Sequence, residues 1–152
     1  MDEFFPYVTG ENLNGKLLRI PDGLETTLSL LIVVFRQRNQ RLVDTWVIYT
    51  EELEKQHSEF TYYELPTLST SYRLFRGWID GGMRSGITDP RTRERTITVY
   101  KKSTLMSSLG LEKDDDVHLY LVDRTGRVLW KEHGEADEGK AEQLRLAVEA
   151  HA

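Results

Sequence analysis

Residues 28–35 read Leu28-Ser-Leu-Leu-Ile-Val-Val-Phe35, an apolar run that a single serine interrupts. A near-continuous apolar run rich in β-branched residues is typical of a strand that is covered on both faces, because a solvated face would add alternating polar residues. We therefore predict that this run forms a central parallel strand. It is much shorter than the roughly 20 residues that a membrane-spanning helix requires.

The segments on either side of this run predict further elements. Asn14-Gly15 has the chemistry of a tight hairpin turn, whose two central positions need positive φ, and predicts a β-ribbon over residues 12–20. Apolar residues recur at helical spacing over about residues 40–60, which predicts a crossover helix. A second strand is expected at residues 60–65 and should stop at Pro66, which lacks the amide that a central ladder needs.

The second half of the chain combines an irregular stretch with a clear hairpin. Residues 72–79 suggest a short helix, and residues 81–95, with three glycines and one proline, predict a long surface loop. The elements expected after it are a strand at 96–100, a helix capped by Ser103 and stopped by Gly110, an antiparallel hairpin at 117–122 and 127–130 with Gly126 in its turn, and a closing helix capped by Asp137.

Together these elements predict an α/β protein with a three-layer α/β/α architecture, a mixed central sheet and an N-terminal β-ribbon. Strands joined by helices imply parallel crossovers, and the hairpin adds an antiparallel edge. The 152 residues suit one domain, of which residues 1–11 would be an extended N-terminal segment.

Composition excludes several classes of function. The formal net charge of −5 opposes non-specific binding to nucleic acid, which depends on Lys and Arg neutralising phosphates. The absence of cysteine excludes disulfides, thiolate metal sites and cysteine nucleophiles. Asp2 and Glu3 stand where a secretory signal would be basic, so we expect a cytoplasmic protein, or one of the mitochondrial matrix if a presequence was removed.

The order of elements, with a VVF strand leading into a helix and the hairpin sequence VHLYLVDRTGRVLW, resembles the thioredoxin-like superfamily, nearest its redoxin and peroxiredoxin branch. Within that group the segments GENLNGKLLRIPDGL, LIVVFRQRNQRLVDTW, YELPTLS and IDGGMRSGITDPRTRERTITVYKK resemble the Atp10 family. Mitochondrial members of that family assist assembly of the membrane sector of ATP synthase. The resemblance implies a chaperone-like assembly factor that binds a protein partner.

In active members of the superfamily the redox cysteines follow the first core strand, where a helix N-terminus stabilises a thiolate. Residues 36–41 of this chain read RQRNQR at that position. The cis-proline of the superfamily would fall at about Asp116-Val117, where this sequence has no proline. The resemblance therefore implies a redox-inactive protein that keeps the scaffold without the chemistry.

Two groups of residues are candidates for binding a partner or an anion, because Arg side chains suit carboxylate and phosphate recognition. The first follows the central strand, where open α/β sheets usually bind ligands, and the second lies in the glycine-containing stretch. They are Arg36, Arg38, Asn39 and Arg41, and Arg84, Arg91, Arg93 and Arg95. In both places, charges that only solvate the surface are the alternative interpretation.

No motif predicts a catalytic residue, a cofactor or a metal. The four histidines share no i,i+3 or i,i+4 spacing, and the acidic run at residues 114–116 lacks the pattern of a calcium loop, so a solvated turn is expected there. The sequence favours a non-enzymatic protein-binding or assembly factor. Its client could be a membrane protein. The alternative is a small-molecule or anion binder, or a cysteine-independent enzyme, that uses the arginines at the former redox site.

Overall fold

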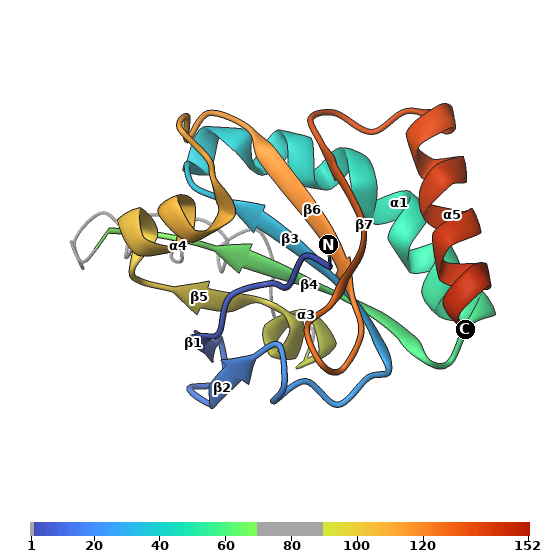
Figure 1. Cartoon of the computed structure of the whole chain (residues 1–152), viewed down its shortest axis with the longest axis horizontal. Helices are drawn as coiled ribbons and strands as arrows, with labels where there is room; N and C mark the ends of the chain where they lie inside the picture. Colours follow the sequence, from blue (N-terminus) through green and yellow to red (C-terminus); the bar gives the residue numbers. More distant parts are fainter. Residues whose placement is uncertain (1, 70–89) are drawn as a thin grey trace.

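The computed structural model of the chain describes residues 2–69 and 90–152. Figure 1 shows a central sheet with two long helices on one face, and a smaller helix and a small sheet on the other. The helix predicted at residues 72–79 lies outside the described residues.

The main sheet is mixed and has the strand order β4-β3-β6-β7. Its strands are β3 (Leu28–Val34), β4 (Phe60–Pro66), β6 (Val117–Val122) and β7 (Val128–His133). β3 pairs in parallel with β4 and antiparallel with β6, and β6 and β7 form the predicted hairpin around Gly126, whose φ is 88°. The architecture predicted from the sequence is confirmed.

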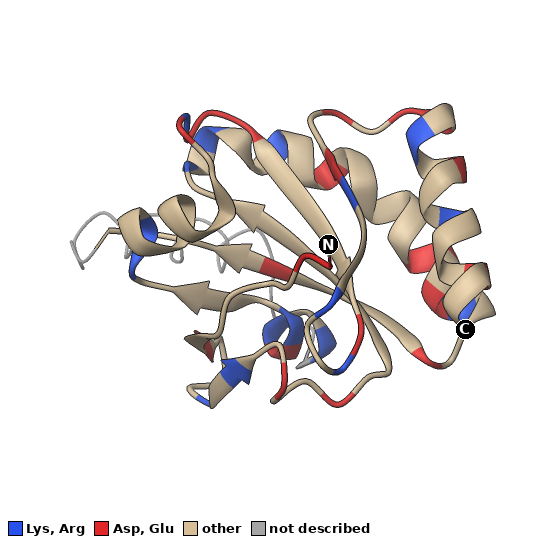
Figure 2. Ribbon diagram, viewed as in Figure 1, with Lys and Arg blue, Asp and Glu red and all other residues tan. Residues whose placement is uncertain are grey.

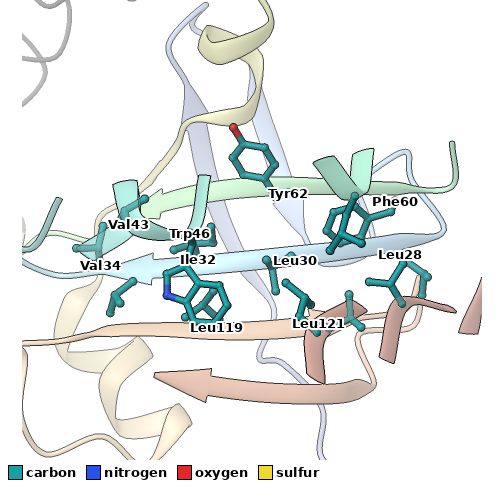
Figure 3. Packing of buried hydrophobic residues seen from close by; sticks show 14 of the residues in the cluster. Leu28, Leu30, Ile32, Val34, Val43, Trp46, Phe60, Tyr62, Leu119 and Leu121 are labelled. Atoms are coloured by element: carbon teal, nitrogen blue, oxygen red, sulfur yellow. The ribbon is translucent and has the colours of Figure 1, made fainter. Parts of the chain in front are cut away.

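All seven residues of β3 are buried because both faces of the strand are covered. Leu30 and Ile32 point into one hydrophobic cluster, and Leu31 and Val33 point into another on the opposite face. Full burial of such a side chain contributes about 1.5–3 kcal/mol. Figure 3 shows the first cluster, where apolar side chains of β3, β4 and β6 meet Val43 and Trp46.

The first cluster is covered by α1 (Gln40–Gln56) and α5 (Glu138–His151). The helix predicted to reach residue 60 ends at Gln56, because Phe60 already belongs to β4 and pairs with Leu28. The predicted cap of α5 is confirmed, since the Asp137 carboxylate accepts a hydrogen bond from the amide of Lys140 at 2.8 Å.

The opposite face is covered by α4 (Lys102–Leu109) and by a small sheet with the order β2-β1-β5. Its strands are β1 (Val8–Asn12), β2 (Leu17–Ile20) and β5 (Ile97–Val99). Parallel bridges from Thr96 and Val99 connect it to β4 and its continuation. The ribbon was predicted to begin at residue 12, and in the structure β1 occupies Val8–Asn12 of the expected extended segment.

Three local expectations need correction. Of the two turn residues, Gly15 has positive φ (81°) and Asn14 does not. Helix α4 has Lys101 rather than Ser103 at its N-cap, although the left-handed Gly110 ends it as predicted. The last part of the predicted 81–95 loop is the helix α3 (Pro90–Arg95), and residues 81–89 lie outside the described residues.

Candidate functional site

The chain turns from strand to helix directly after β3. Phe35 is buried, Arg36 has an extended backbone, and a short 3-10 helix, η1 (Gln37–Asn39), leads into α1. This is the position where the resemblance to the thioredoxin-like superfamily would place the redox cysteines. It presents the side chains of Arg36 and Arg38 to solvent.

Arg36 does not offer a free charge at this position. Its Nε donates to Oδ1 of Asp114 at 2.8 Å, and Nζ of Lys102 donates to the other carboxylate oxygen at 2.5 Å. These two hydrogen bonds lower the pKa of Asp114 from 3.8 to about 2. The carboxylate therefore links the exit of β3 to the start of α4.

Arg38 makes a second ion pair of the same kind, 3.0 Å from Asp115. The hydrogen bond from Arg38, followed by one from Asn39, lowers the pKa of Asp115. Asn39 is buried, and its Oδ1 has no hydrogen-bond partner in the described part of the chain. Arg41 is exposed in the first turn of α1 and makes no ion pair with another described residue.

The acidic run at residues 114–116 forms an exposed bend, as the sequence predicted, but two of its carboxylates are ion-paired with the arginines after β3. Figure 2 shows this acidic segment beside the basic start of α1. The reason is the pairing of β3 with β6, in which Val34 lies opposite Val117, so that the residues before β6 meet the residues after β3. We refer to Arg36, Arg38, Lys102, Asp114 and Asp115 as the arginine–aspartate cluster.

The cluster replaces both redox elements that the resemblance would place here. The position after β3 carries arginines, and the position before β6 carries aspartates. In the described part of the chain the one cis peptide bond is Ile20-Pro21, at the end of β2.

The second group of candidate arginines lies on α3 and is bound to neighbouring elements. Arg95 is 6% exposed, and its Nη1 donates to Glu54 of α1 at 2.8 Å. The same guanidinium lies 3.9 Å from the ring centre of Tyr62 on β4. Figure 3 shows the Tyr62 ring standing away from the apolar row, on the side of α3. Arg91 reaches the other oxygen of Glu54 at 3.3 Å.

Arg93 binds the turn between β1 and β2. Its Nε donates to Asn14 Oδ1 at 2.9 Å, and its Nη2 donates to the carbonyl of Leu13 at 2.6 Å. Helix α3 therefore connects α1, β4 and the ribbon. Figure 1 shows α3 well separated from the start of α1, so the structure does not join the two groups of arginines in one site. Arg84 lies outside the described residues.

One acidic side chain near the start of α1 had no signal in the sequence. Glu64 of β4 accepts a hydrogen bond from Gln40 Nε2 at 2.9 Å. Burial raises the pKa of Glu64, while the hydrogen bond from Gln40 opposes the shift. Only the parallel pairing of β3 with β4, which brings Glu64 level with Ile32, could have placed it beside α1.

Neither a metal centre nor a membrane span is found in the described part of the chain. No three acidic or histidine side chains there are grouped to hold a metal ion. None of the helices described is both long enough and apolar enough to cross a bilayer.

The fold is that of thioredoxin-like proteins. A thiol:disulfide interchange protein from Bacteroides sp. matches with a TM-score of 0.64 at 16% identity, over 99% of this chain and 88% of that one. BsSco, a member of the Sco family of cytochrome c oxidase assembly proteins, matches with a TM-score of 0.68 at 11% identity, over 99% and 94%. Copper-bound ScoI from Arabidopsis thaliana matches with a TM-score of 0.65 at 9% identity, over 97% and 99%.

At these identities the likeness defines the fold alone. The family is defined by the sequence: the model of the ATP10 protein family matches residues 3–150, and this chain belongs to that family. No curated protein matches the chain. The resemblance predicted from the sequence is confirmed at both levels.

Proposed function

We propose that this chain is a non-catalytic assembly factor that binds a protein partner through the surface at the exit of β3. Membership of the ATP10 family supports a role in assembling ATP synthase, with a subunit of its membrane sector as the client. Because the chain has no cysteine, it cannot perform thiol–disulfide exchange by itself. The proposed role therefore requires binding and no redox chemistry.

The observation that supports this proposal is the arginine–aspartate cluster at the former redox position. Arg38 and Asp115 are 62% and 55% exposed, so the pair remains available to a partner while it defines the local shape. Arg41, three residues after Arg38 in the sequence, adds an exposed positive charge at the start of α1. Such a rim of charges favours specificity and orientation of a partner more than raw affinity.

A small-molecule or anion site at the same arginines is the second candidate, and the geometry favours it less. Arg36 and Arg38 already bind carboxylates of the chain, so an incoming anion must displace Asp114 or Asp115. A thermal-shift series with phosphates and carboxylates measures this alternative, because a ligand of the folded state raises the melting temperature.

Site-specific photo-crosslinking tests the proposal. A crosslinking amino acid at position 41 is expected to capture a membrane-sector subunit of ATP synthase from solubilised membranes of the source cells. The matched control is the same amino acid at position 146, where Leu146 is 53% exposed on α5. Failure to capture such a subunit from position 41, or equal capture from both positions, would contradict the proposal.

We also propose the compartment that the N-terminal sequence predicts. The chain is expected in the cytoplasm, or in the mitochondrial matrix if a presequence was removed. A fluorescent fusion of the full-length gene product would distinguish the two.

A further inference from the structure

A cavity of about 350 Å³ lies between the ribbon, the loop after β2, β4 and α3. It is separate from the arginine–aspartate cluster, none of whose residues line it. Its volume falls in the range of roughly 300–1,000 Å³ that is typical of small-molecule sites. Neither the family match nor the proposed assembly role assigns a ligand to it.

The apolar part of the cavity wall comes from Leu18, Leu24 and Tyr63. Leu24 is buried, and Leu18 and Tyr63 are half-buried and pack against the second hydrophobic cluster. This wall can receive an apolar group of modest size.

Two polar side chains of the wall are buried and fixed by the protein. Glu54 and the ring of Tyr62 hold the guanidinium of Arg95. Asn12 is 6% exposed, and its Oδ1 accepts hydrogen bonds from the amides of Asn14 and Lys16, each at 2.9 Å. The amide nitrogen Nδ2 of Asn12 makes no hydrogen bond to any described residue, so it remains a donor for a ligand.

The rim of the cavity carries charges of both signs. Arg91, which forms an ion pair with Glu54, lines the cavity, and so do Lys16, Glu25 and Glu94. None of the last three forms an ion pair with another described residue. The rim can therefore bind an anionic and a cationic group together.

We propose that this cavity binds a free α-amino acid with an apolar side chain. Lys16 and the Asn12 amide would bind the carboxylate, Glu25 and Glu94 would bind the ammonium group, and Leu18, Leu24 and Tyr63 would contact the side chain. A ligand with one charge leaves the opposite charges of the rim unused, whereas an α-amino acid matches both. This inference is independent of the proposed assembly role.

Calorimetric titration of the full chain with L-leucine and L-phenylalanine tests the inference. Leucinamide lacks the carboxylate and N-acetyl-leucine lacks the ammonium group, so each is expected to bind about fivefold more weakly than leucine, as for the loss of one solvent-accessible ion pair. Equal binding of leucine and either blocked form would overturn the proposal, as would an absence of binding by both amino acids.

Two variants test whether Lys16 and Glu94 determine the selectivity for the free amino acid. Lys16→Met is expected to bind leucine about fivefold more weakly and to lose its preference for leucine over leucinamide. Glu94→Gln is expected to weaken the binding of leucine to a similar degree. The preference of this variant for leucine over N-acetyl-leucine should be smaller than that of the unchanged protein. Glu112→Gln, at an exposed position that does not line the cavity, is the matched control. Affinities that stay unchanged in Lys16→Met and Glu94→Gln place the amino acid elsewhere and refute the assignment.

Discussion

The buried ion pair between Glu54 and Arg95 makes a sharp prediction about stability. The side chains of Glu54 and Arg95 are 5% and 7% exposed. Glu54→Gln keeps the shape of the side chain and removes its charge, so the Arg95 guanidinium stays buried without a counter-charge. Breaking such a pair from one side costs about 3–5 kcal/mol.

The structure places the expected loss at the lower end of that range, near 3 kcal/mol, because the Tyr62 ring still contacts the cation at 3.9 Å. The second arginine contributes little, since Arg91 is 66% exposed and an exposed pair is worth at most about 1 kcal/mol. For a chain of 152 residues a loss of 3 kcal/mol lowers the melting temperature by roughly 6–12 °C.

Urea unfolding at pH 7 measures the free energy of unfolding, with the m-value as a check that the extent of unfolding is unchanged. Glu52→Gln on the exposed face of the same helix is the matched control and should change the free energy by less than about 0.5 kcal/mol. Removing both partners in Glu54→Gln with Arg95→Met should cost about 2 kcal/mol less than the sum of the single losses. A loss below about 1 kcal/mol for Glu54→Gln, or strictly additive losses, would refute the reasoning.

Two further predictions concern the cluster and the hairpin. Because the folded-state pKa of Asp114 is lowered to about 2 from 3.8, its ionised form stabilises the fold above about pH 4, and this contribution of about 1 kcal/mol disappears as the pH falls towards 2. Asp114→Asn should remove that contribution at pH 7 and flatten the pH dependence of the urea midpoint between pH 4 and 2; an unchanged profile contradicts it. Gly126→Ala should cost about 1–3 kcal/mol, because φ is 88° and the new Cβ would lie 2.5 Å from Pro21 Cγ; an unchanged melting temperature argues against this.

The pattern of apolar residues was sufficient to predict the elements whose side chains form the core. Residues 28–35 were predicted to form a strand covered on both faces, and Leu28–Val34 form such a strand. This prediction was possible because an unbroken apolar run indicates burial on both faces, whichever elements cover them. The predicted end of α1 was wrong, also because of the apolar pattern. Phe60 follows Leu53 by seven residues, which fits a helix, yet both side chains reach the same cluster from different elements.

The candidate site was only half predictable, because its contacts are long-range. The arginines at the exit of β3 could be singled out by their position, but their partners are 77 and 78 residues away and depend on β6 lying beside β3. Helix α3 has no apolar periodicity, and an ion pair 41 residues away in sequence holds it. A propensity argument therefore predicts a loop there.

The fold alone does not determine the function of this protein, because the side chains at the site differ between proteins with the same fold. The resemblance to thioredoxin-like proteins implied redox cysteines at the exit of the first core strand and a cis-proline before the strand that lies antiparallel to it. Here the same two segments meet through Arg36 and Asp114, so the scaffold still brings them together and the residues decide what happens there. A fold that places two segments face to face can support a reaction or an ion-paired surface, and the choice depends on a few side chains.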